Sequence, residues 1–388
     1  MDFTFTEEQE MFREMVRDFA QKEVLPLAET LDREERPPLE TLKKAAKLDL
    51  FGILFPEKYG GVDAGIITYC IMMEELGKVC SATAGTIGVD VGVGAMTIYL
   101  DGTEEQKQKY LTPLAKGEKL AAFALTEPNA GSDAASITTS AVRDGDYYVL
   151  NGSKTWITNG DIADLIVTFA VTSKGSGARG ISAFIVEKDF PGFKVGWREK
   201  KMGLRGTSTC QLFYDDCRVP VANLLGGRPG LGFLTAMRTL DFGRLSIGAS
   251  CLGGAQAALK ASIEFASQRQ QFGGPIANKQ AIQFIIADMA TEIESLRHMV
   301  YHAAWLAEMG KKYSREAAMC KLWGSQILVR AVNKAVQVHG GMGYMKRFPI
   351  ERYYRDARIT EIFEGTNEIQ RFVIASDLFK EVGVRLMP

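Results

Sequence analysis

The first part of the chain shows the apolar spacing of helices. One stripe, at spacings of three, four and five residues, predicts an amphipathic helix and consists of Phe12, Met15, Val16, Phe19 and Val24. Pro26 allows a break after it. Further helices are expected over residues 39–50, from residue 76 after the breaker run FPEKYGG, and near Thr103, where Gln106 completes a capping box. Residues 1–120 are therefore predicted to form one α-helical domain.

The period changes in the middle of the chain and returns to helical near its end. Residues 121–228 carry the β-rich runs YYVLNG, KTWIT, LIVTFAV and ISAFIVE, separated by glycine-rich turns, which favours an antiparallel barrel or sandwich. After Pro229 a long apolar stripe reappears, at Ile282, Ile285, Met289, Ile293, Leu296, Val300 and Ala303. We expect an α+β multidomain protein, with a four-helix bundle over residues 229–388.

Residues 79–100 are apolar enough to be mistaken for a membrane span, since they contain no lysine or arginine. Their glycines, threonines and Asp90 interrupt the continuous hydrophobicity that a span of about 20 residues requires. We therefore expect a buried interior helix rather than a membrane span.

Composition narrows the range of functions. With 46 basic and 47 acidic residues, the chain has no charge excess that would favour a nucleic-acid partner. Six cysteines without a paired short spacing do not suggest a disulfide scaffold, and His298 and His302 lack the glutamate of a zinc protease, so no metal site is expected. The acidic, amphipathic N-terminal stretch resembles no signal or transit peptide, which leads us to expect a cytoplasmic protein.

Six motifs carry the chemical information. FALTEPNAGSD (residues 123–133), KTWITN, KMGLRGTST, RQQFGGPI, QVHGGMGY and RDARITEIFEGTNEIQR follow one another at spacings that resemble the acyl-CoA dehydrogenase family over essentially the whole chain. The glycine-rich stretches at 92–94 and 340–343 do not follow a strand in a βαβ unit, so a nicotinamide cofactor is not expected.

The resemblance implies an FAD site between the β domain and the C-terminal helices. It places one group of cofactor contacts within the subunit, at Leu125, Thr126, Ser132, Trp156, Thr158, Thr366 and Glu368. It assigns a second group to the FAD of a neighbouring subunit, at Arg269, Phe272, Gln280, Gln337, Gly340 and Gly341. Hydroxyl groups and an aromatic ring suit the flavin, and a guanidinium suits its pyrophosphate. Without the resemblance, Trp156 could equally be a core residue and Arg269 a surface charge.

The resemblance also assigns the catalytic base. In FEGTNEI, Glu364 matches the carboxylate that removes the α-proton of an acyl-CoA thioester, and its backbone N–H would polarise the thioester carbonyl. Some relatives place the base one residue before an arginine in the motif that reads LDFGR here, but that position is Gly243. The substrate contacts that carry over are Ser132, Asp241, Arg244 and Gly365. From composition alone, Glu364 would be an ordinary solvated acid.

The substrate is expected to be short or compact. The last 50 residues are most similar to short-chain, butyryl-like members, and Gly85 lies near the position where glutaryl-type members carry an arginine. Asp90 departs from the family pattern. It is either an acid satisfied by helix ends or solvent, or a contact to an unusual acyl group such as an alicyclic carboxyl-CoA.

Partners and electron acceptor follow from the same resemblance. An electron-transferring flavoprotein and sister subunits in a homotetramer are expected. An oxidase that reduces O₂ and a non-catalytic relative of the same fold stay open as alternatives.

Overall fold

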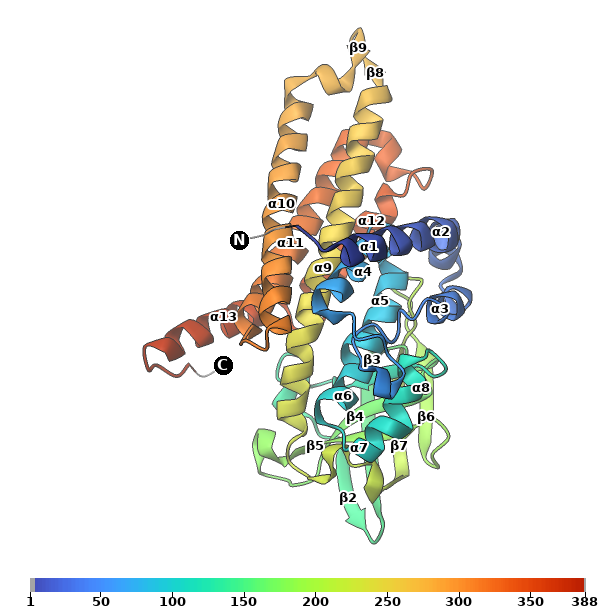
Figure 1. The fold of residues 1–388 in the computed structure, drawn as a ribbon, viewed down its shortest axis with the longest axis vertical. Helices are drawn as coiled ribbons and strands as arrows, with labels where there is room; N and C mark the ends of the chain where they lie inside the picture. The colour runs from blue at the N-terminus through green and yellow to red at the C-terminus, as the bar shows by residue number, and fades with distance from the viewer. Residues whose placement is uncertain (1–3, 387–388) are drawn as a thin grey trace.

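The computed structural model of the protein describes residues 4–386, which form helical, β and helical regions in sequence order (Figure 1). The first region contains α1 (Glu7–Phe19), α2 (Leu25–Glu34), α3 (Leu39–Ala46), α4 (Gly65–Gly77), α5 (Ser81–Val89), α6 (Met96–Asp101), α7 (Glu104–Gln106) and α8 (Thr112–Ala115). This order confirms the predicted fold class.

The first helix starts at a capping box and does not break where the sequence suggested. The Thr6 side chain accepts a hydrogen bond from the backbone N–H of Gln9, and the Gln9 side chain accepts one from the backbone N–H of Thr6. After Phe19 the chain widens into a π-helical turn, η1 (Ala20–Val24), and continues directly into α2. The expected break at Pro26 is wrong. Pro26 lies in the first turn of α2, where the missing N–H of proline costs little, so the chain stays helical there. The capping box of Thr103 and Gln106 is present as predicted.

The interior helix follows α4, a helix that was not predicted from the sequence. α4 runs to Gly77, and the chain then turns through Lys78–Cys80, so the helix expected from residue 76 starts only at Ser81. α5, the π-helical turn η3 (Asp90–Ala95) and α6 form one apolar segment, Ser81–Asp101. By length and composition this segment could cross a membrane, but 72% of its most apolar window is buried inside the protein, as expected of an interior helix.

The middle region is a seven-stranded sheet. Its strands are β1 (Ala121–Ala124), β2 (Ser140–Asp144), β3 (Tyr147–Thr158), β4 (Leu165–Val171), β5 (Ile181–Glu187), β6 (Phe193–Arg198) and β7 (Thr209–Pro220), in the order β1-β4-β2-β3-β7-β6 with β5 on β4. Most pairs are antiparallel as predicted, but β1 runs parallel to β4, and β2 meets β4 in parallel at Ser140 and Val171. The β2–β3 hairpin separates these two strands in sequence, so they pair without a tight turn.

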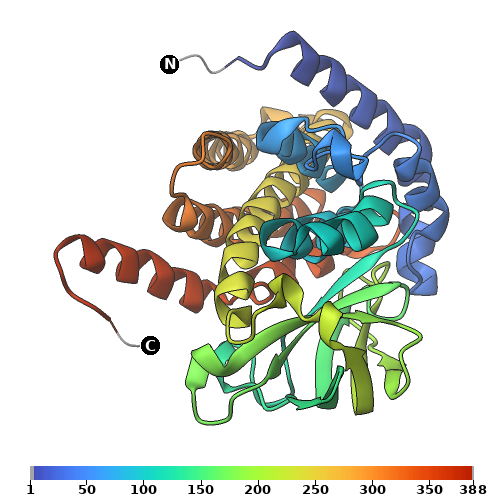
Figure 2. The same ribbon diagram turned by 60° about the horizontal axis from the view of Figure 1, so that its bottom comes forward.

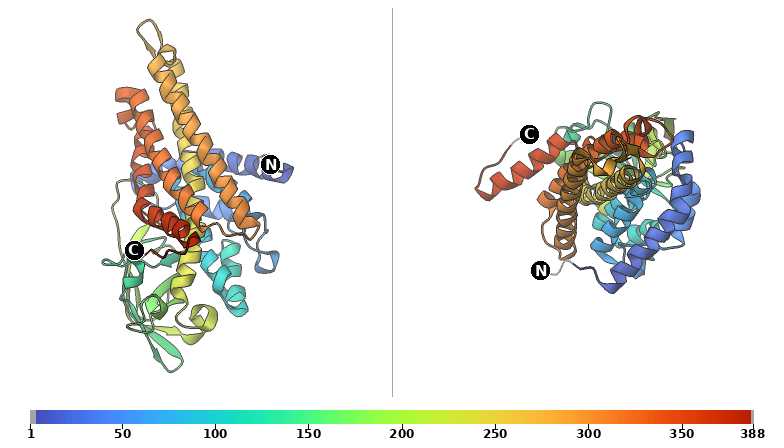
Figure 3. Two further views of the ribbon diagram at one scale, coloured as in Figure 1. Left: turned by 90° about the vertical axis from the view of Figure 1, so that its left-hand side faces the viewer. Right: turned by 90° about the horizontal axis from the view of Figure 1, so that it is seen from above.

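Three long helices of the C-terminal region, α9, α10 and α11, run side by side, and two shorter helices follow them (Figure 3). They are α9 (Gly232–Gln268), α10 (Gln280–Glu308), α11 (Ser314–His339), α12 (Ile350–Ala357) and α13 (Asn367–Glu381). A small hairpin of β8 (Gln270–Gln271) and β9 (Gly274–Pro275) joins α9 to α10 at one end of the molecule. α13 projects away from the other helices (Figure 2).

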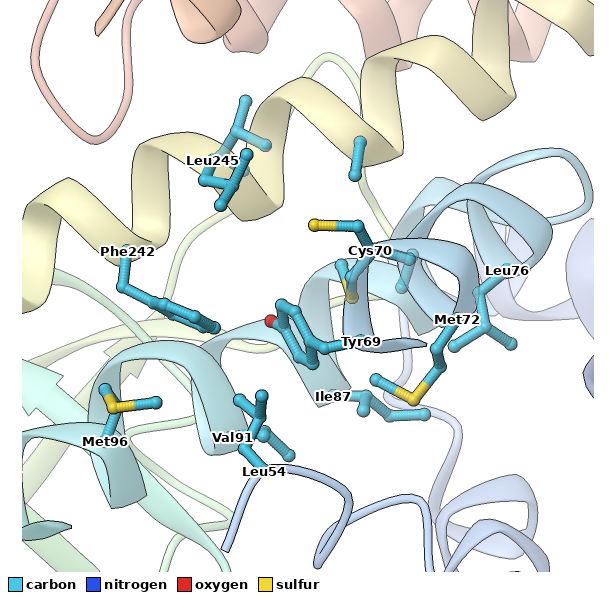
Figure 4. Close-up of a cluster of buried hydrophobic side chains, with 14 of the residues drawn as sticks. Leu54, Tyr69, Cys70, Met72, Leu76, Ile87, Val91, Met96, Phe242 and Leu245 are labelled. Atoms are coloured by element: carbon cyan, nitrogen blue, oxygen red, sulfur yellow. The ribbon is translucent and has the colours of Figure 1, made fainter. Parts of the chain in front are cut away.

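One apolar core joins the two helical regions. α4 packs along α9, and Tyr69 points toward Phe242 with ring centroids 5.1 Å apart (Figure 4). The Tyr69 hydroxyl lies 2.8 Å from the hydroxyl of Ser246 on α9. This packing fixes α9 against α4, and the candidate site lies beside that contact.

Candidate active site

Glu364 lies in a tight turn between η11 (Arg358–Glu361) and α13. Glu364 and Gly365 both have positive φ angles, 51° and 88°, and a left-handed conformation is unfavourable for glutamate without support. Thr366 caps α13 by accepting a hydrogen bond from the backbone N–H of Ile369 at 3.3 Å. The buried Gln370 donates to the carbonyl oxygens of Glu364 and Gly365, at 3.3 and 2.9 Å. α13 therefore holds the turn in place.

The Glu364 side chain is directed at α9. Its buried Oε2 atom has no hydrogen-bond partner within residues 4–386. A Cβ atom at Gly243 would collide with this oxygen and lie 3.0 Å from Val93 Cγ1, so glycine at this position makes room for the carboxylate. The glycine that cannot act as a base is thus also the one that admits Glu364.

Burial sets the acidity of this carboxyl. It raises the pKa of Glu364 to about 7, although the positive charges of Lys321 and Arg244 act in the opposite direction. Neither cation forms an ion pair with Glu364 in the part of the chain that the structure describes. A buried base with a pKa near neutrality suits proton abstraction from a weak carbon acid.

The predicted substrate residues Asp241 and Arg244 lie on α9 next to Gly243. Arg244 donates to Asp241 Oδ1 at 2.7 Å, and Ser314 at the start of α11 donates to the other oxygen of Asp241. Burial raises the pKa of Asp241, which the Ser314 hydrogen bond and the Arg244 charge oppose. Arg244 is therefore held by Asp241, close to Glu364 without contacting it.

The predicted flavin residues Leu125 and Thr126 are held against β3 by a buried ion pair that the motif reading missed. Lys154 donates to the Leu125 carbonyl at 2.9 Å and to Glu127 Oε1 at 2.8 Å. Burial lowers the pKa of Lys154 to about 8; for Glu127 the hydrogen bonds and the Lys154 charge outweigh burial and hold the pKa at about 2. Residue alternation in β3 gives a signal for this pair, because Lys154 is an even number of residues from the inward-facing Leu150.

Trp156 and Thr158 follow Lys154 on the same strand. The register of β3 against β7 shifts between Lys154 and Ile157, and Trp156 has a φ angle of 57°. This irregularity turns the indole outward, leaving it 60% exposed. A large aromatic face held at a distorted strand, beside hydroxyl and backbone groups of the 125–132 loop, fits a planar ring such as the isoalloxazine of FAD. Ser132 lies exposed on that loop.

The second group of predicted flavin residues lies elsewhere in the chain. Arg269, Phe272 and Gln280 surround the β8–β9 hairpin, at the opposite end of the molecule from the β sheet (Figure 1). Three further residues of this group lie at the end of α11 or directly after it: Gln337, Gly340 and Gly341. Nothing lies within 4 Å of a Cβ position at either glycine. One chain thus does not bring the hairpin residues to its own Trp156, and their role in a neighbouring subunit stays a prediction.

Asp90 opens the π-helical turn η3 and is 1% exposed. One carboxyl oxygen accepts a hydrogen bond from the backbone N–H of Ala121, and the other is buried without a partner in residues 4–386. Burial raises the pKa of Asp90 well above its ordinary value. The first interpretation, an acid satisfied by helix ends or solvent, is therefore wrong, because the partner of Asp90 is the first residue of strand β1 and the side chain is buried.

Comparisons with known proteins agree with this arrangement. Family models match the chain in three parts: the acyl-CoA dehydrogenase N-terminal domain over residues 6–118, the middle domain over 122–217 and the C-terminal domain over 230–379. The short-chain specific acyl-CoA dehydrogenase of Clostridium acetobutylicum is 47% identical, covering 98% of this chain and 100% of that protein.

Two solved structures superpose closely. Butyryl-CoA dehydrogenase from Megasphaera elsdenii has a TM-score of 0.96 and 42% identity, covering 98% of this chain and 100% of the other. An acyl-CoA dehydrogenase from Bacillus anthracis, complexed with FAD, has a TM-score of 0.93 and 39% identity over 98% of this chain and 68% of that chain. The predicted family, fold and cofactor are confirmed: the chain belongs to the acyl-CoA dehydrogenase family of FAD-dependent oxidoreductases.

Proposed function

We propose that the chain oxidises a short-chain or compact acyl-CoA to the corresponding enoyl-CoA, with Glu364 as the base. The observation that carries the proposal is the buried, unpartnered Oε2 of Glu364, in a space that Gly243 leaves open. The α-proton passes to this carboxylate, and the electron pair of the α-C–H bond forms the new double bond as hydride leaves the β-carbon. Bound FAD supplies the hydride acceptor.

The turn that carries Glu364 also offers a group for the thioester oxygen. Within residues 4–386 the backbone N–H of Glu364 donates no hydrogen bond, so it is free to bind a carbonyl. Such a donor stabilises the negative charge that develops on the oxygen as the α-proton leaves, which makes the α-carbon more acidic. Arg244 and Asp241 shape the substrate side of α9, and Gly365 gives the substrate close access to the backbone.

The packing around Glu364 favours a small acyl group. Val93 from η3 lies 3.0 Å from the position that a Cβ atom would take at Gly243. Phe242, the preceding residue of α9, packs against Tyr69 in the buried interior (Figure 4). The similarity to the short-chain specific dehydrogenase of Clostridium acetobutylicum supports the same size class.

We further propose that the free oxygen of Asp90 contacts the acyl group and favours an alicyclic substrate. Asp90 lies three residues before Val93 on η3. Burial raises the pKa of Tyr69, and the charges of Glu364 and Asp90 raise it further, so both carboxyl groups lie near Tyr69. If Asp90→Asn leaves the kinetics on both cyclohexanecarboxyl-CoA and butyryl-CoA unchanged, this contact does not exist.

The proposed working form is a cytoplasmic homotetramer that passes electrons to an electron-transferring flavoprotein in β-oxidation. The separation of Arg269 from Trp156 within one chain supports an oligomer, because the two groups can serve one FAD only across subunits. Ser132, Thr158, Thr366 and Glu368 remain proposed contacts to cofactor or substrate.

The decisive experiment is anaerobic bleaching of the visible flavin band by butyryl-CoA and by cyclohexanecarboxyl-CoA. Wild-type protein should bleach with at least one thioester, whereas Glu364→Gln with full FAD content should not. Normal bleaching of the Gln variant would remove Glu364 as the base, and no bleaching of loaded wild type would exclude a short or compact substrate. Admitting air to the reduced enzyme then tests the oxidase alternative, since reoxidation within seconds would favour O₂ as acceptor.

A further inference from the structure

Behind the Glu364 turn lies a buried lysine to which the sequence reading assigned no role. Lys321 is in the middle of α11, and its side chain is 0% exposed. A buried ammonium group loses several kcal/mol of hydration, which an ion pair or good hydrogen bonds normally offset. Lys321 forms no ion pair within residues 4–386, and Asn367 Oδ1, at 3.1 Å, is its only hydrogen-bond acceptor there.

Asn367 connects this lysine to the turn. It is the first residue of α13, three positions after Glu364, and it is buried. Its Oδ1 atom accepts hydrogen bonds from both Lys321 and Ser325, the latter at 3.0 Å. With Gln370 holding the carbonyls of Glu364 and Gly365, the start of α13 is tied to α11 on one side and to the left-handed turn on the other.

The charge of Lys321 also reaches Glu364. The charged or titratable groups around Glu364 and Lys321 come from four elements: Arg244 and Cys251 on α9, Lys321 on α11, Tyr69 on α4 and Glu361 on η11. Glu361 is paired with Arg358, so its negative charge is partly compensated. Arg244 is already paired with Asp241, so its charge is partly compensated. Lys321 has only neutral hydrogen-bond partners, and with its pKa lowered to about 8, mainly by burial, it is largely protonated at neutral pH.

We propose that Lys321 is a positioning residue for the base: through Asn367 it anchors the turn that carries Glu364, and its uncompensated charge favours the ionised carboxylate. This inference rests on the proposed role of Glu364. Without the lysine charge, burial would leave more Glu364 protonated at neutral pH and unable to accept the α-proton. The lysine itself contacts neither substrate nor cofactor.

The test separates charge from packing. Lys321→Gln removes the charge but keeps a donor for Asn367, and Lys321→Met removes both. Lys321→Arg keeps the charge, and Asn367→Ala removes the anchor while leaving the lysine. Lys334→Gln serves as a control, since it neutralises a charge on the same helix that is paired with Asp288 at 3.4 Å.

Each holoenzyme is titrated with pH and followed by infrared difference spectroscopy. The carboxylic-acid band that is present in wild type and absent from Glu364→Gln belongs to Glu364. This band measures the protonation of Glu364 without turnover. The midpoint should rise by on the order of one pH unit in the Gln and Met variants and stay near the wild-type value in the Arg and Lys334→Gln variants. Asn367→Ala also removes the hydrogen-bond acceptor of the Lys321 ammonium, so it is judged by its bleaching rate and not by its midpoint. In anaerobic bleaching by butyryl-CoA, the Gln variant should lose about tenfold in rate at pH 6, whereas Asn367→Ala should lose rate at every pH.

An unchanged Glu364 midpoint in Lys321→Gln would overturn the proposal. If Lys321→Met does not fold, the Gln variant decides, because it preserves the hydrogen bond to Asn367. Normal bleaching by Glu364→Gln would instead refute the proposed function, and the infrared titration would still report whether Lys321 controls the protonation of Glu364.

Discussion

At the scale of single residues, Asp90 makes the stability of this protein depend on pH. Burial raises the pKa of Asp90 in the folded state, so the folded chain keeps a proton that the unfolded chain releases above about pH 4. The contribution of Asp90 to the free energy of unfolding is therefore most favourable at low pH. This contribution falls as the pH rises from about 4 toward the pKa of Asp90 in the folded state. Asp90→Asn keeps an oxygen to accept from Ala121 but cannot ionise. We expect its melting temperature at pH 7 to exceed that of wild type by about 2 °C or more, measured by calorimetry; a lower value at pH 7 would contradict this account.

Gly243 gives a second prediction at the same scale, because a methyl group there would collide with Glu364 Oε2. Gly243→Ala should displace the carboxylate and slow anaerobic bleaching by roughly tenfold to a hundredfold, while FAD content stays normal. Gly254→Ala is the matched control on α9, since a Cβ atom there lies 3.0 Å from the flexible end of Leu328 and 3.9 Å from the Gly77 carbonyl oxygen, which is an ordinary contact distance. Equal rates for the two variants would show that the fit of Gly243 to Glu364 is unimportant.

At the scale of elements, the attachment of the 125–127 segment to β3 depends on the buried pair Lys154–Glu127. Glu127 also accepts hydrogen bonds from the backbones of Thr138 and Thr139, at 2.7 and 2.9 Å, so it organises both ends of the loop. Lys154→Met leaves the Glu127 carboxylate buried without its ion-pair partner. This loss should lower the free energy of unfolding by about 3–5 kcal/mol and weaken FAD binding. Denaturant unfolding and FAD titration measure both effects. The double variant Lys154→Met/Glu127→Gln should recover part of the loss; no recovery would mean that Lys154 acts through packing alone.

The elements also show how far the sequence could be interpreted. Changes of period revealed the helix–strand–helix order, and the polar interruptions of residues 79–100 predicted an interior helix. α4 was missed because nearly all of its residues from Thr68 to Gly77 are buried, so it has no polar face to mark a helical period. The parallel pairing of β1 with β4 was missed because alternation predicts a strand but not its neighbour. Glu364 was identified only through its motif, since its burial, which produces its unusual acidity, depends on α9 and α11.

At the scale of the whole molecule, the hairpin between α9 and α10 is the part of the chain that supports the proposed oligomer. Phe272 at its tip is 93% exposed and Phe284 on α10 is 60% exposed, an unusual position for large apolar side chains unless a partner covers them. If Arg269 binds the FAD pyrophosphate of a neighbour, Arg269→Ala should weaken FAD binding about tenfold or more, without changing the bleaching rate of the loaded enzyme.

Mixed oligomers test the direction of this contact. In an oligomer of Arg269→Ala and Glu364→Gln subunits, a site that combines Glu364 of the first subunit with Arg269 of the second has every required group. In such mixed oligomers, these sites should bind FAD with wild-type affinity and should bleach on addition of substrate. The measurement is the amplitude of bleaching when FAD is limiting. If Arg269 served the flavin of its own subunit, every site with an intact base would lack the arginine, and mixing would restore nothing.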